Sequence, residues 1–142
     1  MKIVVVTPAK NEALHIKKLL LSLVKLKYSV VVVDDGSFDN TSQLASKHTP
    51  YVLTHSINLG KGSSLKTGCE FAFDTLGADA VIILDSDGQH SPSDIPLFCK
   101  QLEKGFEIVL GIRTSSNEMP FQKQIMNKVL SLIFFSIYGI YI

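Results

Sequence analysis

The sequence has few cysteines and almost no net charge. Its two cysteines, Cys69 and Cys99, form no CxxC pair, so we expect reduced thiols in or near the core rather than a disulfide framework. The net charge is +1, from 14 basic and 13 acidic side chains, without the clustered basic excess of a nucleic-acid-binding face. The N-terminal apolar run, residues 3–6, is too short for a signal peptide, which predicts a cytoplasmic protein.

The sequence also lacks internal repeats and low-complexity linkers. Hydrophobic residues make up 46% of the chain and charged residues 19%, which is typical of a globular protein. Its 142 residues are enough to bury a core. We therefore expect a single domain over residues 1–142.

Short apolar runs alternate with segments of helical spacing along the chain. Runs of this kind, ended abruptly by polar residues or Pro, are typical of strands buried on both faces. Strands are expected at residues 3–6, 30–33, 51–53, 80–84 and 106–110, and helices over 39–46 and from about residues 11, 63 and 92. The alternation predicts an α/β fold with a mainly parallel central sheet.

Polar clusters follow three of these expected strands directly. They are Asn11-Glu12, Asp34-Asp35 and Asp85-Ser86-Asp87. In open α/β sheets, ligands collect at the carboxyl ends of the strands. The sequence therefore predicts a crevice at that edge, with carboxylates from three strand ends.

Asp85 and Asp87 are the sharpest candidates for a metal site. Two carboxylates with one residue between them can reach the same cation, and Mg²⁺ and Mn²⁺ prefer oxygen ligands that they share with substrate phosphates. The alternative is an Asx turn with solvated acids. Because Gln89 and His90 follow, and acids stand at two other strand ends, we favour the metal.

Two cations are candidates for binding phosphate. The loop around Lys61 lacks the spacing of a P-loop, and its lysine is as readily explained by solvation as by a diphosphate. Arg113 is the better candidate, because a guanidinium can bind two oxygens at once. The carboxylate of Asp35 could accept from a base or a ribose, although helix capping by Ser37 or Asp39 is an alternative reading of that motif.

Taken in order, these segments resemble the family 2 glycosyltransferases, which have the GT-A fold. The resemblance covers residues 1 to about 138, and its nearest branch is that of the dolichol- and polyprenyl-phosphate sugar transferases. Five motifs in the right order carry it: VTPAKNE (6–12), VDDGS (33–37), NLGKG (58–62), DSDGQH (85–90) and GIR (111–113).

The resemblance implies a role for each matched position. Asp85 and Asp87 would hold the divalent metal with Gln89 assisting, Ser86 would lie against the nucleotide, and Arg113 would approach the diphosphate. The family usually has Ala at the position of Ser86, and a hydroxyl there should not abolish metal binding. The nucleoside pocket would be lined by Pro8, Glu12, Val33 and Asp35.

The implied reaction is metal-dependent transfer of a hexose from a UDP- or GDP-sugar to a polyprenyl-phosphate oxygen, with inversion. Family members continue into an acidic segment and a Ser-Gly-Phe-Arg motif on the acceptor side, whereas this chain stops at Ile142. We therefore expect a truncated chain, in which no residue can be assigned as the general base. The alternative is a nucleotide-sugar-binding fragment without turnover.

Residues 129–142 are nearly all apolar. The segment is too short to span a bilayer, which takes about 20 residues. We favour a helix that packs against a missing C-terminal part over an interfacial helix near a lipid-linked acceptor. Left uncovered, this surface predicts self-association. The interfacial reading would make the protein peripheral at a membrane.

Other enzyme classes fit the motifs less well. A phosphatase of the haloacid dehalogenase type needs Thr or Val where this chain has Gln89, and its motif lies near the N-terminus. A nucleotidyltransferase would have a GxGxR loop after the first strand. A dinucleotide-dependent oxidoreductase would also need glycines that are missing there.

Overall fold

The computed structural model describes residues 1–111. The chain divides into two units, residues 1–105 and 106–142, and the elements described here belong to the first. They are β1 (Ile3–Ala9), α1 (Ile16–Lys25), β2 (Ser29–Asp34), α2 (Thr41–Ser46), β3 (Tyr51–Thr54), α3 (Lys61–Glu70), a π-helical turn (Phe71–Thr75), β4 (Ala80–Ile83), a 3-10 turn (Pro92–Asp94) and α4 (Ile95–Glu103).

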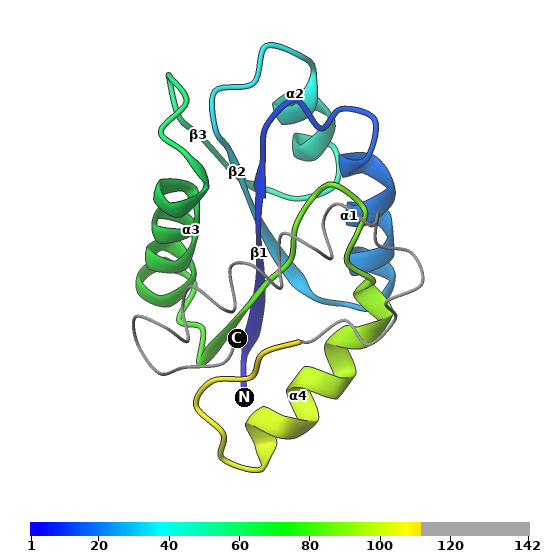
Figure 1. Cartoon of the computed structure of the whole chain (residues 1–142), viewed down its shortest axis with the longest axis vertical. Coiled ribbons are helices and arrows are strands. Elements are labelled where there is room, and N and C mark those ends of the chain that lie inside the picture. Colours follow the sequence, from blue (N-terminus) through cyan, green and yellow to red (C-terminus); the bar gives the residue numbers. More distant parts are fainter. Residues whose placement is uncertain (112–142) are drawn as a thin grey trace, which may run out of the picture. The chain divides into compact units, whose positions relative to one another are not determined.

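The four strands form one parallel sheet in the order β3-β2-β1-β4, which confirms the predicted α/β class. Figure 1 shows the loops after β1, β2 and β3 together at one end of the sheet. The chain adds β2 and β3 on one side of β1 and then returns to add β4 on the other. The sheet therefore has a switch point between β1 and β4, where ligands bind in folds of this type.

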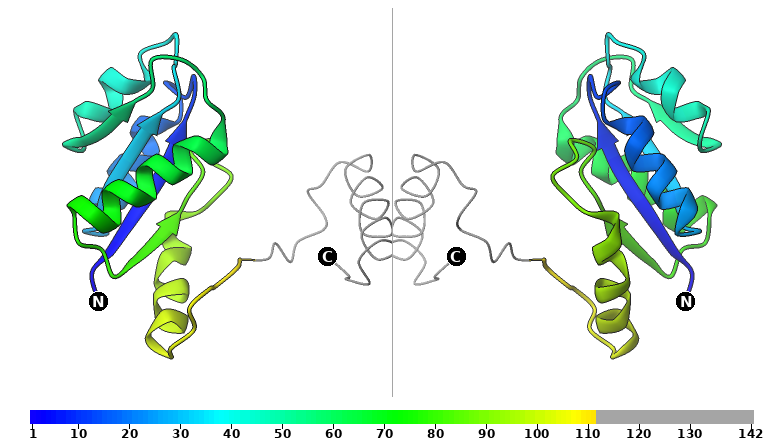
Figure 2. Two further views of the ribbon diagram at one scale, coloured as in Figure 1. Left: turned by 90° about the vertical axis from the view of Figure 1, so that its left-hand side faces the viewer. Right: turned by 90° about the vertical axis from the view of Figure 1, so that its right-hand side faces the viewer.

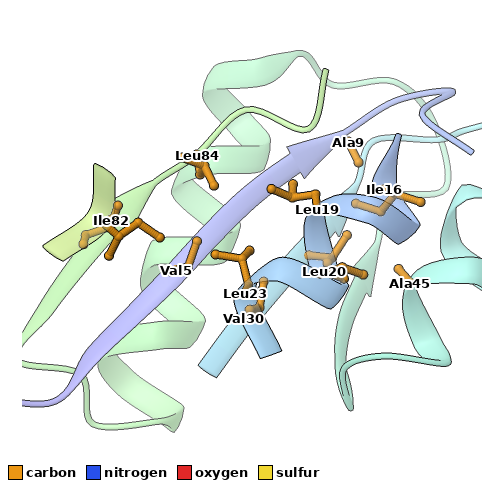
Figure 3. Close-up of a cluster of buried hydrophobic side chains, with 12 residues drawn as sticks. Val5, Ala9, Ile16, Leu19, Leu20, Leu23, Val30, Ala45, Ile82 and Leu84 are labelled. Atoms are coloured by element: carbon orange, nitrogen blue, oxygen red, sulfur yellow. The ribbon is translucent and has the colours of Figure 1, made fainter. Parts of the chain in front are cut away.

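Alternate residues of the strands supply two separate cores. Val5, Val30 and Val32 face α1, whose Leu20 and Leu23 are fully buried, and α2 and α4 add Ala45 and Ile95 to this core (Figure 3). Val4, Val6, Val31 and Val33 face the other way, against α3 and the π-helical turn. Helices on both faces explain why the strands read as continuous apolar runs, and the views in Figure 2 show the sheet between them.

β1 is longer than predicted, because it runs through Thr7-Pro8 to Ala9. Its pairing with β4 ends at Val6, while pairing with β2 continues to the end of the strand. Proline has no backbone N–H to donate, and it is tolerated at position 8 because β1 pairs there with β2 alone and no longer with β4. α1 in turn begins at Ile16 rather than near Asn11, whose positive φ of 55° belongs to a turn.

One of the five predicted strands was wrong. Residues 106–110 form no strand within the part of the chain that the structure describes, since a strand needs a ladder partner and the described sheet ends at β4. Phe73, in the π-helical turn, is 45% exposed. Leu14 lies in a turn before α1 and is also exposed.

Candidate functional site

A cleft of about 260 Å³ opens beyond the carboxyl ends of β1, β2 and β4, at the switch point of the sheet. Carboxylates from three separate loops enter it, as the sequence predicted. The lining residues are Pro8, Ala9, Lys10, Glu12, Asp35, Asn58, Lys61, Ser64, Asp85, Ser86 and Asp87.

One hydrogen bond joins the two loops that frame the cleft, and a second lies within the loop after β4. The buried hydroxyl of Ser86 donates to the carbonyl oxygen of Pro8 at 2.8 Å, and so connects the end of β4 to the end of β1. The backbone N–H of Asp85 donates to Nδ1 of His90 at 3.2 Å. An alanine at position 86 could not make the first bond, so here the hydroxyl positions the Asp85–Asp87 segment.

Asp85 forms an ion pair with the side chain of Lys61. The ammonium of Lys61 lies 2.7 Å from Oδ1 and 2.9 Å from Oδ2 of Asp85. The lysine side chain is 59% exposed and the carboxylate 25%, so the pair adds little stability. Lys61 is thus neither simply solvated nor separated from the predicted metal ligands, and its ammonium shows that Asp85 is placed to bind positive charge.

The Asx turn that the sequence left as the alternative to a metal role is formed at Asp87. Its Oδ1 accepts the backbone N–H of Gln89 at 2.9 Å, which is the Asx turn, while its side chain also lines the cleft. Within residues 1–111 no three His, Cys, Asp or Glu side chains gather around one point. Two carboxylates without a third ligand do not fit a closed structural site. They fit Mg²⁺ or Mn²⁺ that completes its shell with water and substrate phosphate.

The pKa of the Glu12 carboxyl is raised by its surroundings in the cleft. Burial raises the pKa of its carboxyl, and the charges of Asp87 and Asp39 raise it further against the opposing effect of His15. Repulsion between the carboxylate of Glu12 and those of Asp87 and Asp39 destabilises the folded chain, so this arrangement does not serve stability. Such a carboxyl in a cleft is typical of a functional site.

Asp35 holds the neighbouring loop in place. Its Oδ1 accepts the backbone N–H of Leu59, and its Oδ2 that of Gly60, both at 2.8 Å. Burial alone would raise the pKa of Asp35, but the hydrogen bonds from His55 and these two amides outweigh it and lower the pKa. Both carboxylate oxygens therefore have protein donors while the residue also lines the cleft.

His55 is a site residue that the sequence analysis missed. Its Nδ1 lies 2.8 Å from Asp35 Oδ1, and its Nε2 lies 3.1 Å from the hydroxyl of Thr67 on α3. It thereby links the acid at the end of β2 to α3. Its position directly after β3 was the available signal, since polar residues after the other strands had already been singled out. His55 supports Asp35 without lining the cleft, whereas Lys10 and Asn58 do line it, although no role had been assigned to them.

The structure brings together six of the nine predicted site residues in the cleft: Pro8, Glu12, Asp35, Asp85, Ser86 and Asp87. Val33 is fully buried in the core beneath α3 and does not line the cleft. Gln89 contributes its backbone to the turn of Asp87. Arg113 lies outside the described residues. The substrate and metal roles of the eight residues other than Val33 stay predictions.

Comparison with known proteins decides the family. The model of the family described as glycosyl transferase family 2 matches residues 4–140. The chain belongs to glycosyl transferase family 2. The resemblance predicted from the five motifs is confirmed.

Two relatives of this family 2 chain are a dolichyl-phosphate and an undecaprenyl-phosphate sugar transferase. It is 31% identical to a UDP-N-acetylglucosamine–dolichyl-phosphate N-acetylglucosaminyltransferase of Methanococcus voltae, over 99% of this chain and 64% of the relative. It is 28% identical to an undecaprenyl-phosphate 4-deoxy-4-formamido-L-arabinose transferase of Yersinia pestis, over 86% of this chain and 40% of the relative. It spans 59% and 60% of two further relatives, from Methanocaldococcus jannaschii.

Solved structures agree on the fold. The glucosyl-3-phosphoglycerate synthase of Mycobacterium tuberculosis, in complex with phosphoglyceric acid, superposes on 97% of this family 2 chain with a TM-score of 0.70 at 22% identity, covering 51% of that protein. The same synthase with Mn²⁺ and UDP-glucose gives a TM-score of 0.60 at 27% identity, over 73% of this chain and 40% of that one.

Proposed function

We propose that the cleft binds a nucleoside-diphosphate sugar, UDP- or GDP-linked, together with Mg²⁺ or Mn²⁺. The observation that carries the proposal is the pair Asp85 and Asp87 at the switch point, with the ammonium of Lys61 already on Asp85. The family, and the Mn²⁺ and UDP-glucose bound by a structurally similar synthase, support it.

Each side of the cleft has a task in this proposal. Asp85 and Asp87 would hold the metal, with Gln89 assisting, and the metal would neutralise the diphosphate as it leaves. Arg113 would approach the same diphosphate. The nucleoside would lie along Pro8, Glu12 and Asp35, with Ser86 against the nucleotide, whereas Val33 is buried beneath α3 and is not exposed to it.

We further propose that the whole protein transfers the sugar to a polyprenyl-phosphate oxygen with inversion. Relatives that use dolichyl- and undecaprenyl-phosphate support this acceptor class. Since the chain spans only 59% and 60% of the two relatives from Methanocaldococcus jannaschii, the transfer step is proposed for the whole protein and not for residues 1–142 alone. No residue of this chain is assigned as the general base.

The alternative function is nucleotide-sugar binding without turnover. The same cleft would then bind the donor and stop there. Incubating the 142-residue chain with donor, Mn²⁺ and a short polyprenyl phosphate separates the two functions. Sugar found on the lipid would refute the alternative.

Titration calorimetry tests the donor site directly. UDP, GDP and their common sugars are titrated with and without Mn²⁺ into the wild type and into Asp87→Ala. We expect metal-dependent binding to one of the two bases and a loss of at least about tenfold in the variant, because one charge-assisted contact accounts for that much. Asp74→Ala removes an exposed acid of the π-helical turn and should bind as the wild type does. A folded chain that binds neither nucleotide would overturn the proposal.

A further inference from the structure

Large apolar side chains are exposed on the loops that follow β1, β2 and β3. Phe38 is 95% exposed and Leu14 90%, which makes them the most exposed large hydrophobic residues of the described chain. Ile57 is 66% exposed and Leu59 52%. Figures 1 and 2 show these loops together at the carboxyl end of the sheet. We call these four residues the apolar rim.

The rim is held in place by hydrogen bonds between its loops. The backbone N–H of Phe38 donates to Oδ1 of Asn11 at 2.9 Å, and that of Asn11 donates to the hydroxyl of Ser37 at 2.9 Å. Gly36 lies so close to the third loop that an added Cβ would come within 2.8 Å of the carbonyl carbon of Ile57. The apolar residues of the three loops are therefore held in place at one end of the sheet by contacts between the loops.

Leu14 also begins a strip along the outer face of α1. At helical spacing it is followed by Lys17, Lys18, Leu21 and Lys25, and these residues line one groove. The three lysines are exposed, Leu21 is 48% exposed, and α1 has no acidic residue. We call this strip the basic face of α1.

The two surfaces have the composition of a site that lies on a bilayer. Lysines flanking an exposed leucine can lay their stems along apolar surface and keep their ammonium groups among lipid headgroups. Anionic lipids attract such clustered lysines even though the chain as a whole has a net charge of only +1. The phosphates of a nucleic acid could contact the lysines, but the exposed leucines and isoleucine beside them would have no partner in it.

We propose, building on the function proposed above, that the apolar rim and the basic face of α1 dock the protein on an anionic membrane surface. The segment that carries Leu14 into the rim also supplies Pro8 and Glu12 to the cleft. Docking by this edge brings the mouth of the cleft to the level of the headgroups. A membrane-bound polyprenyl phosphate has its phosphate at that level.

Vesicle co-sedimentation tests the basic face. The wild type is expected to bind phosphatidylcholine vesicles that contain about one third phosphatidylglycerol, to bind pure phosphatidylcholine far more weakly, and to be released by salt. Replacing Lys17, Lys18 and Lys25 by Gln should weaken binding about fivefold per lysine, or on the order of a hundredfold together. The matched control replaces three exposed lysines elsewhere, Lys47, Lys100 and Lys104, and should keep most of the binding.

Tryptophan fluorescence tests the rim, because the chain has no tryptophan of its own. The emission of Phe38→Trp should shift to the blue on anionic vesicles, and that of Phe73→Trp, on the exposed π-helical turn, should not. Absence of vesicle binding by the wild type, or an equal loss in both lysine triples, would overturn the proposal. So would a Phe38→Trp emission that is already blue-shifted without vesicles, since a second copy or another part of the chain would then cover the rim.

These outcomes are separate from those of the donor site. Vesicle binding is measured without nucleotide or metal, and nucleotide binding by calorimetry without vesicles. Nucleotide binding without vesicle binding would leave the proposed donor site standing and remove the membrane surface. Vesicle binding without nucleotide binding would do the reverse.

Discussion

At the scale of single residues, the ammonium of Lys61 would compete with the proposed divalent metal for the carboxylate of Asp85. Lys61 contacts both oxygens of Asp85, so a metal must displace it or share the group. Lys61→Met removes the competing charge and should tighten Mn²⁺ binding in the absence of nucleotide by about two- to fivefold, the range of an exposed ion pair. Electron paramagnetic resonance of free Mn²⁺ during a titration measures this.

Lys66→Met is the matched control for that experiment. Lys66 is paired with Glu70 on α3 and is 76% exposed, so its loss should leave Mn²⁺ affinity unchanged. Equal Mn²⁺ affinity in Lys61→Met and the wild type would mean that Asp85 is not a metal ligand, or that Lys61 moves away at no cost.

The residues of the cleft differ in how far they could be predicted. Asp85 and Asp35 were predictable, because parallel strands end at one edge of the sheet and each acid directly follows a strand. The burial of Val33 was not, since a strand buried on both faces is apolar throughout and hides which way each residue points. The bond between His55 and Asp35 joins two loops, and local spacing does not report such contacts.

At the scale of elements, Asp35 fixes the loop between β3 and α3. In Asp35→Asn the amide can accept from only one of the two N–H groups, of Leu59 and Gly60, that the carboxylate serves. Losing one of these two bonds should lower the free energy of unfolding at pH 7 by about 1–2 kcal/mol, measured by urea denaturation, even though the N–H of Gly60 also donates to Oδ1 of Asn58 at 3.1 Å. Asp74→Asn, on the exposed π-helical turn, should cost almost nothing.

The loss of stability in Asp35→Asn should depend on pH, and the pKa of Asp35 gives the direction. The folded-state pKa of Asp35 lies below its ordinary value of 3.8. Its stabilisation is therefore complete above that value and is lost as the pH falls through the lower folded-state pKa. The difference in free energy of unfolding between wild type and Asp35→Asn should narrow below about pH 3.8. A gap that did not change in acid would assign the loss to the altered shape of the side chain.

Contact between α3 and the sheet depends on one glycine. A Cβ built on Gly68 would lie 2.5 Å from Cγ1 of Val6 and 3.0 Å from Cγ2 of Val33, and both valines are fully buried. Gly68→Ala gains about 1 kcal/mol in helix propensity but must push α3 off the sheet, a strain that costs about 1–3 kcal/mol. We expect a net loss of stability in urea denaturation, whereas Gly62→Ala, with open space at the Cβ, should not lose stability.

At the scale of the whole molecule, the described sheet and both of its cores lie within residues 1–105. The alternation of strands and helices was predictable because each element carries its own apolar period. The strand expected at 106–110 was not found, because a strand depends on a partner that its own sequence does not specify. The boundary between the two units also divides the family motifs. Four of the five motifs lie in the first unit, and GIR (111–113) lies in the second.

This division predicts how a chain of residues 1–105 behaves. It keeps every residue of the cleft and should unfold cooperatively in urea, since no described element packed in either core is removed. It lacks Arg113, so its affinity for a nucleoside diphosphate with Mn²⁺ should fall about tenfold or more, the size of a lost charge-assisted contact. Calorimetry on the full chain with Arg113→Ala is the comparison. An equal loss in both assigns the effect to the guanidinium, whereas loss in the shortened chain alone would mean that the second unit acts through other residues.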